Sequence, residues 1–264
     1  MAHRRDLSDR GRLLLGPHAV REALTVRSAT VAVVYADARE GRALGPLERL
    51  ARERGVAVEG RSRDELDALS GGDRHQGIVG IAGDYRYCEL EDLLERARPC
   101  PLLLALDQVQ DPHNFGAMVR SAVAFGVDGI LTLRHRAAPV SAAVVRVSAG
   151  ATERARIARV GNLAQTLVAL RERELQVVGL SGDAEHDLDT LPAPPAGRVL
   201  VVGSEGRGLR RLTAERCDLL ARLPLASGFE SLNASVAAAL AIYESTRARR
   251  ETLAHQDGRA DDGR

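Results

Sequence analysis

An amide and a guanidinium stand close together in the segment VQDPHNFGAMVRSAVAFG, residues 109–126. Asn114 comes directly after a proline and a histidine, and Arg120 follows six residues later in an otherwise apolar helical stretch. An arginine in such a helix either extends its charged head into solvent or points at an anionic ligand. An asparagine at a helix start ordinarily caps free backbone N–H groups. This segment by itself does not decide whether Asn114 is a helix cap or a site residue, or whether Arg120 faces solvent or a ligand.

A glycine-rich turn follows a second apolar run in VVGSEGRGL, residues 201–209. Gly203, Gly206 and Gly208 allow backbone to approach a ligand closely, and Glu205 places an acid among them. The order is neither the dinucleotide-binding G-x-G-x-x-G nor a P-loop ending in G-K-[ST]. Glu205 is therefore either a ligand-facing acid or an ordinary exposed turn residue.

A third polar stretch, SLNAS, follows an apolar run that ends at Pro224 and begins an alanine-rich helix. Ser231 and Asn233 lie at its start, where either one can act as the helix cap. The alanines that follow leave room for close packing, either against another subunit or within the core. In open parallel sheets, ligands bind where strands end and loops return into helices. The three stretches are thus candidates for one site.

Composition excludes several classes of protein. The 264-residue chain is 45% hydrophobic, carries a formal net charge of +1 and has 37 basic residues, all of them arginine. Near neutrality argues against a strongly electrostatic nucleic-acid binder, although arginine itself suits phosphates. No stretch approaches an apolar membrane span, and the first residues, MAHRRDLSDRGR, lack the apolar core of a secretory signal. We therefore expect a soluble protein of the cytoplasm.

The cysteines and histidines form no recognisable ligand set. Cys88, Cys100 and Cys217 are odd in number, widely spaced and never in a C-x-x-C arrangement, so we expect three reduced thiols. The seven histidines are dispersed, without H-E-x-x-H or a comparable spacing. The sequence predicts no metal centre.

Apolar periodicity divides the chain into two α/β regions between polar ends. The expected organisation is disordered ends at 1–12 and 249–264, a small N-terminal α/β domain at 13–83, a linker at 84–100 that is helical in its middle, and a second domain at 101–248. Strands and helices alternate in the second domain, which predicts a mainly parallel sheet covered by helices on both faces. Asn162, with Gln165 three residues later, resembles a capping box and predicts a helix start.

Taken together, in this order and spacing, the three polar stretches resemble the sequence motifs of the SpoU-type RNA ribose 2'-O-methyltransferases, the TrmH family. GPHAVREAL near the start and HQGIVGIAG at 75–83 are similar to the N-terminal domain of its bacterial 23S ribosomal RNA guanosine subgroup. The resemblance spans about residues 13–248. It implies S-adenosylmethionine as methyl donor, an obligate homodimer, and a SPOUT methyltransferase domain with a deep C-terminal trefoil knot. It also implies an L30-like N-terminal domain that captures substrate RNA.

The resemblance assigns roles to individual residues. Its catalytic positions correspond to Asn114, Arg120, Glu205, Ser231 and Asn233, and its cofactor-binding backbone corresponds to Gly203, Leu223 and Leu232. The segment ASGFESLNAS departs from the family pattern, which is richer in serine and valine before the serine and often has valine at position 234. This departure concerns the shape of the loop and the detail of the substrate.

Methyl transfer to a ribose requires activation of a poor nucleophile, the 2'-hydroxyl, and its alignment with the donor methyl. A guanidinium is protonated at any ordinary pH, so we expect Arg120 to engage the 3'-phosphate of the target nucleotide bidentately. The phosphate or a transiently neutral Arg120 then helps to remove the proton. Asn114 and Ser231 are expected to hold the ribose and backbone, while Asn233 and Glu205 order the surrounding loops.

Two further functions fit the same residues. One is a transfer RNA 2'-O-methyltransferase of the same superfamily, although the N-terminal HQGIV favours ribosomal RNA. The other is a non-catalytic RNA-binding factor for ribosome assembly, against which the presence of all five polar residues argues. A generic nucleotide-binding α/β enzyme is disfavoured by the missing dinucleotide and P-loop patterns. The sequence thus predicts methylation of a ribose 2'-hydroxyl in RNA, at a guanosine of 23S ribosomal RNA.

Overall fold

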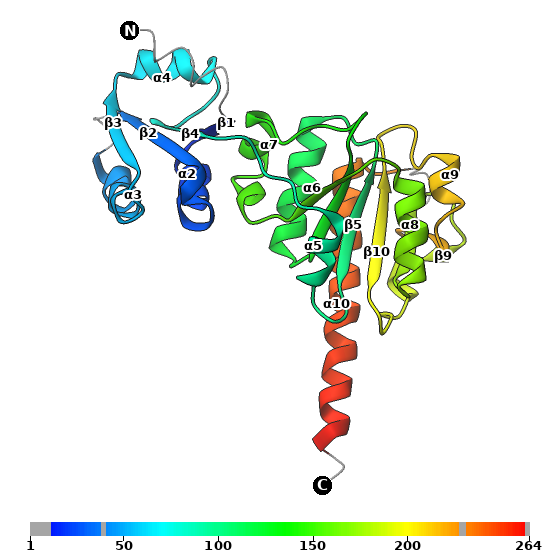
Figure 1. The fold of residues 1–264 in the computed structure, drawn as a ribbon. Helices are drawn as coiled ribbons and strands as arrows, with labels where there is room; N and C mark the ends of the chain where they lie inside the picture. The colour runs from blue at the N-terminus through cyan, green and yellow to red at the C-terminus, as the bar shows by residue number, and fades with distance from the viewer. Residues whose placement is uncertain (1–11, 38–40, 227–230, 262–264) are drawn as a thin grey trace. The chain divides into compact units, whose positions relative to one another are not determined.

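The chain forms two compact units in a computed structural model (Figure 1). The structure describes residues 12–37, 41–226 and 231–261, and the side chains of 12–37, 44–226 and 231–250. The first unit contains the chain up to Arg86 together with Pro139–Arg154. The second contains Tyr87–Ala138 and the chain from Ala155 onward.

The first unit is a small α/β arrangement. Its elements are β1 (Arg12–Leu15), α2 (Pro17–Val26), the 3-10 helix η1 (Ser28–Thr30), β2 (Val31–Asp37), α3 (Gly41–Glu53), β3 (Ala57–Arg61), α4 (Arg63–Ser70), β4 (Ile78–Ala82), α7 (Ala142–Val147) and the 3-10 helix η2 (Ala151–Glu153). The α/β character predicted for residues 13–83 is confirmed. β1 was not predicted, because a four-residue apolar run is too short to show a period.

The sheet of this unit has the order β1-β4-β2-β3. β4 pairs antiparallel with both β1 and β2, while β2 and β3 are parallel. All residues of β4 are buried, because it has a neighbouring strand on each side and helices against the sheet. Leu15, Leu66 and Val79 pack together in a core cluster of this unit.

The second unit is built on a seven-stranded sheet. Its elements are α5 (Leu90–Glu95), β5 (Leu102–Asp107), α6 (Pro112–Ala124), β6 (Gly129–Leu133), β7 (Ile157–Val160), α8 (Leu163–Glu172), β8 (Gln176–Leu180), β9 (His186–Asp187), the 3-10 helix η3 (Leu188–Thr190), β10 (Arg198–Gly203), α9 (Arg211–Ala214), β11 (Leu219–Arg222) and α10 (Ala234–Asp261). The strand order is β7-β6-β5-β10-β8-β11-β9, and each adjacent pair is parallel. The predicted parallel sheet is confirmed.

Helices cover both faces of this sheet. Alternate residues along a strand point to opposite faces, and Leu103 and Ala105 of β5 pack in one cluster with Leu93 of α5 and Leu167 of α8. α10 packs against α6 and also contacts β10, so these two helices cover the other face (Figure 1). Burial on both faces explains why the strands are continuous apolar runs rather than alternating ones.

Side-chain caps fix two helix starts. Ser62 and Glu65 form a capping box at α4, in which each side chain accepts a hydrogen bond from the backbone N–H of the other. At α8, Asn162 Oδ1 accepts from Gln165 N at 3.2 Å, so the predicted helix start is confirmed. Both helices therefore begin where the sequence supplies an acceptor for free backbone N–H groups.

Between β6 and β7 the chain leaves the seven-stranded sheet, and residues 139–154 become part of the first unit. The carboxylate of the fully buried Glu153 pairs with the Arg12 guanidinium, with 3.1 Å between Nη2 and Oε2. Arg27 donates from Nε to the Glu153 carbonyl at 2.9 Å, and Tyr85 lies against both arginines. Sequence periodicity did not predict this insertion, because it carries no information about which earlier segment a helix packs on.

The structure also differs from expectation at two segment boundaries. Residues 84–100 contain the helix expected in their middle, α5, but they are not a free linker, because Leu93 is fully buried in the core of the second unit. α10 continues to Asp261, past residue 249, where a disordered tail was expected; its alanine, arginine, glutamate and leucine residues favour helix. The disorder expected at 1–11 and 262–264 lies outside the described residues. Within the described chain, no helix combines the length and apolarity needed to cross a membrane.

Candidate active site

The three polar stretches meet at the carboxyl edge of the seven-stranded sheet. β5 ends at Asp107 and β10 ends at Gly203, and these two residues are partners in the parallel register. β11, which ends at Arg222, lies beyond β8 on the other side of β10, and α10 starts at Ala234. Because parallel strands all present their carboxyl ends at the same edge, segments far apart in the sequence come together there.

The glycine turn after β10 is tightly closed. A Cβ placed on Gly203 would lie 2.1 Å from the Gly208 carbonyl carbon, so no side chain fits at that position. Ser204 and Gly208 exchange two backbone hydrogen bonds, of 3.2 and 2.9 Å. Gly206 and Gly208 have φ of 77° and 62°, a left-handed conformation that favours glycine. The turn thereby presents Glu205 at the edge of the sheet.

Asn114, Glu205 and Asn233 form a polar cluster to which each stretch contributes one residue. Asn114 Nδ2 donates to Glu205 Oε2 at 2.7 Å, and Asn233 Nδ2 donates to Asn114 Oδ1 at 3.1 Å. A longer contact of 3.4 Å joins Asn233 Nδ2 to Glu205 Oε2. Asn114 is buried, whereas Glu205 and Asn233 are exposed. The fold thus fixes the amides and leaves the carboxylate accessible.

Helix capping separates the roles of the two asparagines. Asp111, not Asn114, caps α6: its Oδ1 accepts from His113 N at 2.6 Å and from Asn114 N at 2.9 Å. The Asn114 side chain is therefore available to the cluster. Asn233 does cap α10, since its Oδ1 accepts from Ser235 N at 2.9 Å. Asn233 thus both caps α10 and donates a hydrogen bond within the polar cluster.

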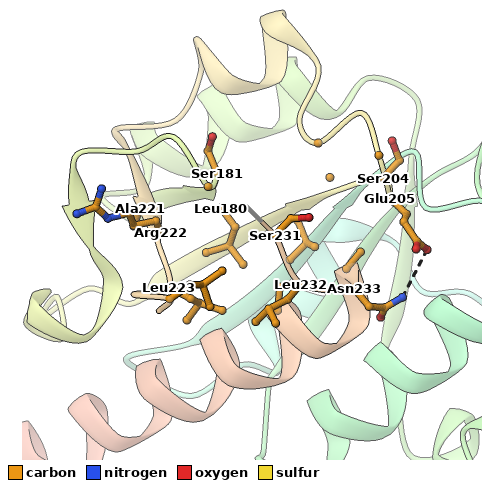
Figure 2. Close-up of a pocket in the computed structure, with 18 residues that line it drawn as sticks. Leu180, Ser181, Ser204, Glu205, Ala221, Arg222, Leu223, Ser231, Leu232 and Asn233 are labelled. Atoms are coloured by element: carbon orange, nitrogen blue, oxygen red, sulfur yellow. Dashed lines mark hydrogen bonds between the residues drawn. The ribbon is translucent and has the colours of Figure 1, made fainter. Parts of the chain in front are cut away.

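A pocket of about 500 Å³ opens beside this cluster. Gly203 and the glycine turn form part of its wall, and Leu223, Leu232 and Ser231 line it as well. Figure 2 shows Glu205 and Asn233 at one end and Arg222 at the opposite end. Pockets of this volume, with apolar walls and a few polar groups, are typical of small-molecule and cofactor sites. The structure thus brings seven of the eight residues named from the sequence to one place, either in the lining or, for Asn114, through its bond to Glu205.

Arg120 is the predicted site residue that does not join this group. It is exposed on α6, does not line the pocket, and makes no hydrogen bond or ion pair with any residue that the structure describes. Asn114 and Arg120 are six residues apart, so on a helix with 3.6 residues per turn their side chains point roughly 120° apart. The six-residue spacing therefore does not bring the Asn114 amide and the Arg120 guanidinium together within a single chain.

The sequence analysis missed the buried acid at the end of β5. Asp107 is 1% exposed and accepts from Arg210 Nε at 2.7 Å and from Arg210 N at 3.0 Å. This pair ties the segment after the glycine turn to the strand that precedes the first polar stretch. A signal was present, because an acid that ends the apolar run LLLALD must find a partner when it is buried.

A second missed pair lies at the far end of the pocket. Arg222, which lines the pocket, donates from Nε to Asp187 Oδ1 at 2.7 Å. The pairing of β9 with the end of β11 brings Asp187 there. Among the side chains that the structure describes, no three His, Cys, Asp or Glu residues are grouped closely enough to hold a metal ion.

Comparison with known proteins gives the site a context. A family model described as the SpoU rRNA methylase family matches residues 101–243, and one described as RNA 2'-O ribose methyltransferase substrate binding matches residues 13–88. A 23S rRNA (guanosine-2'-O-)-methyltransferase of Pseudomonas aeruginosa is 42% identical over 238 residues, which cover 89% of this chain and 95% of the relative.

Two further matches extend over nearly the whole chain. A protein of Mycolicibacterium vanbaalenii named as an uncharacterized tRNA/rRNA methyltransferase is 40% identical over 248 residues, which cover 92% of this chain and 78% of the relative. The AdoMet-bound rRNA methyltransferase structure from Sinorhizobium meliloti superposes with a TM-score of 0.75 at 26% identity, over 94% of this chain and 90% of that one. With three motif stretches assembled around one pocket and both family models matched in order, the chain belongs to the SpoU rRNA methylase family.

Proposed function

We propose that this protein transfers a methyl group from S-adenosylmethionine to a ribose 2'-hydroxyl of RNA, at a guanosine of 23S ribosomal RNA. The observation that carries the proposal is the pocket beside the Asn114–Glu205–Asn233 cluster, in a chain of the SpoU family. The named activity of the Pseudomonas relative supports the choice of substrate.

The pocket suits the cofactor in size and chemistry. Its volume of about 500 Å³ can hold a nucleoside-sized molecule. Leu223 and Leu232 offer apolar surface to an adenine ring, and the backbone around Gly203 offers polar groups without side-chain obstruction. S-adenosylmethionine supplies an electrophilic methyl group on sulfur. The AdoMet-bound structure from Sinorhizobium meliloti supports this choice of ligand.

The residues of the cluster position the acceptor. Asn114 is held between Glu205 and Asn233, so its amide is oriented before any substrate binds. Ser231 is exposed at the pocket and is available to hydrogen-bond the ribose or its backbone. Arg120 engages the 3'-phosphate through its guanidinium, and the phosphate or a transiently neutral Arg120 takes the hydroxyl proton.

A homodimer accounts for two features of the second unit. Val236, Leu240 and Tyr243 of α10 are 44–47% exposed and follow helical spacing, which forms an apolar stripe on one face. Arg120 is exposed away from the cluster of its own chain, so a second copy is the simplest route by which it reaches a substrate. We therefore assign the stripe to a dimer contact.

The remaining family features complete the proposal. β10 enters the sheet between β5 and β8, and the chain then passes beyond β8 to β11, which is compatible with a C-terminal trefoil knot. The first unit serves as the L30-like domain that captures substrate RNA, as its family match supports. Methylation of ribosomal RNA takes place in the cytoplasm, which is where the proposal locates the enzyme.

The second candidate is a transfer RNA substrate, which the tRNA/rRNA name of the Mycolicibacterium relative supports. Incubation of the pure protein with methyl-labelled S-adenosylmethionine and either 23S rRNA or tRNA distinguishes the two. We expect label in 23S rRNA, located at one guanosine by ribose-methylation mapping. Label in tRNA alone would favour the second candidate, and label in neither would favour a non-catalytic factor.

Arg120→Lys tests the assigned guanidinium. Lysine keeps the charge but loses the bidentate fork, so we expect turnover to fall about 100-fold at saturating cofactor. Arg96→Lys is the matched control, since Arg96 is likewise exposed but precedes β5 at the opposite edge of the sheet. Near-normal turnover of Arg120→Lys would overturn the role given to Arg120.

A further inference from the structure

The loop that follows β6 carries three basic side chains at the carboxyl edge of the sheet. Arg134, His135 and Arg136 are all exposed. The loop is anchored at both ends: Arg134 N donates to Val160 O at 2.9 Å, and Ala138 N donates to Val109 O at 2.9 Å. The second bond places the loop beside the segment that leads to Asn114. The basic side chains therefore lie on a fixed support near the polar cluster.

The fold does not neutralise these charges. Arg136 makes no hydrogen bond or ion pair with any described residue, and its φ of 59° is a left-handed conformation unusual for a residue with a side chain. Arg134 is 58% exposed; its Nε donates to the Arg159 carbonyl at 3.3 Å, and its Nη2 lies 4.0 Å from the Glu89 carboxylate. Such an exposed ion pair contributes little. The Arg136 guanidinium and the terminal Nη groups of Arg134 are thus available to an external anion.

Charge is unevenly distributed along this edge of the sheet. Arg207, on the glycine turn after β10, is exposed and also without a partner among the described residues. Of the three acids nearby, Asp107 pairs with Arg210, Asp111 caps α6, and the exposed Glu205 accepts only from two asparagine amides. The three exposed arginines Arg134, Arg136 and Arg207 outnumber the exposed acids Asp111 and Glu205, so these residues give the edge beside β6, β5 and β10 a positive charge.

The other half of the edge has the opposite character. The loop after β8 carries the exposed acids Asp183 and Glu185, directly after pocket-lining Ser181 and Gly182. An anionic chain is attracted to the basic half, whereas a cationic sulfonium compound is compatible with the acidic half. The two substrates of a methyl transfer to RNA differ in charge in this way.

We infer that the loop Arg134–Arg136 is a phosphate-binding element that holds the RNA strand flanking the target nucleotide. This inference rests on the proposed function. Both arginines present five-donor forks that match phosphate oxygens. An RNA strand bound there would pass beside Asn114 and across the glycine turn toward Arg207, and the methyl donor would lie in the pocket on the acidic side.

The test is the double variant Arg134→Ala/Arg136→Gly. Glycine adopts positive φ without steric cost, so this change removes the guanidinium without straining the loop. The matched control is Arg96→Ala/Arg216→Ala, which removes two exposed arginines that precede strands and whose side chains form no hydrogen bond or ion pair with described residues. Filter binding to 23S rRNA is measured at several salt concentrations, with binding of S-adenosylmethionine and thermal unfolding measured in parallel.

We expect the double variant to bind RNA about tenfold more weakly, because two charge-assisted contacts are lost. The slope of log affinity against log salt should fall in magnitude by about 1.4–1.8, the value for two released phosphate contacts. KM for RNA should rise, with unchanged cofactor binding and unchanged turnover at saturating RNA. The single variant Arg136→Gly should show about half of the change in slope.

The inference is overturned if the double variant keeps the RNA affinity and salt slope of the control. Thermal unfolding at or above the wild-type temperature excludes loss of folding as a cause of weaker binding. Failure of the proposed function is a separate result: the wild-type protein would then transfer no methyl group to any RNA, whatever the salt dependence of binding.

Discussion

The two edges of the seven-stranded sheet each carry a carboxylate surrounded by donors, and the two carboxylates differ in what surrounds them. At the amino edge, Asp128 accepts from Leu102 N at 2.9 Å, from Arg98 Nε at 2.7 Å and from Arg249 Nη1 at 3.1 Å. At the carboxyl edge, Glu205 accepts from two asparagine amides and borders a pocket.

Exposure separates the two carboxylates. The Asp128 side chain is 3% exposed, and its partners come from β5, from the segment after α5 and from α10, so it joins three parts of the unit. Glu205 is exposed, and space for a ligand lies next to it. A buried carboxylate whose hydrogen bonds all come from the protein, such as Asp128, stabilises the fold. An exposed carboxylate beside a pocket, such as Glu205, can also accept hydrogen bonds from a ligand.

The variant Asp128→Ala tests the structural role of the carboxylate at the amino edge. Removal of this carboxylate leaves the mostly buried Arg249 without its charged partner, and we expect the free energy of unfolding to fall by about 3–5 kcal/mol. Urea unfolding followed by circular dichroism measures it. Asp183→Ala, which removes an exposed acid, is the control and should change stability by less than about 0.5 kcal/mol. Equal effects of both variants would contradict the structural role of Asp128.

The second change addresses the carboxyl edge. Glu205→Gln keeps the shape of the side chain but removes the charge that holds Asn114 and Asn233, so we expect methyl transfer to fall about 100-fold. In free energy this is about 2.7 kcal/mol of transition-state stabilisation. Initial rates at saturating RNA and cofactor measure it.

Stability should hardly change in Glu205→Gln, because the side chain is exposed. Glu215→Gln, which removes an acid from an exposed helix pair with Arg211, is the matched control for both rate and stability. A loss of stability as large as that of Asp128→Ala, with a normal rate per folded molecule, would reverse the roles given to the two edges.

The smallest expected effect is in the acid range. Burial alone would raise the pKa of Asp128, but the hydrogen bonds from Arg98 and Leu102 and the charges of Arg98 and Arg249 outweigh it, so the pKa lies below the usual value of 3.8. A carboxylate with a lowered pKa contributes stability above its unfolded pKa, and this contribution is lost as pH falls through the folded pKa. The destabilisation caused by Asp128→Asn should therefore shrink as pH decreases below about 4. Urea unfolding of both proteins on either side of this range tests it, and a pH-independent difference would argue against the lowered pKa.

Local patterns predicted much of the second unit. Apolar runs bounded by turns predicted the parallel strands, and the spacing of Asn162 and Gln165 predicted the start of α8. Three polar stretches at strand ends predicted one shared edge, because parallel strands align their carboxyl ends. The pocket that contains Gly203, Leu223 and Leu232 follows from that alignment.

Long-range packing decided what those patterns left open. Asn114 had two possible roles, and the choice depended on Asp111, whose carboxylate takes the capping bonds. Residues 139–154 joined the first unit through the Arg12–Glu153 pair, which links positions far apart in the chain. Neither outcome is encoded in a period or a spacing.

Local sequence therefore specifies the α/β class, the order of the motifs and the residue types at the sheet edge, since these depend on interactions within a few residues. Which side chains meet depends on tertiary packing. Asn114 contacts Glu205 and Asp107 contacts Arg210, whereas Arg120 contacts none of these four residues through a hydrogen bond or ion pair. The physical reason is that backbone propensity and capping act locally, whereas a side-chain contact depends on how separate strands and helices pack against one another.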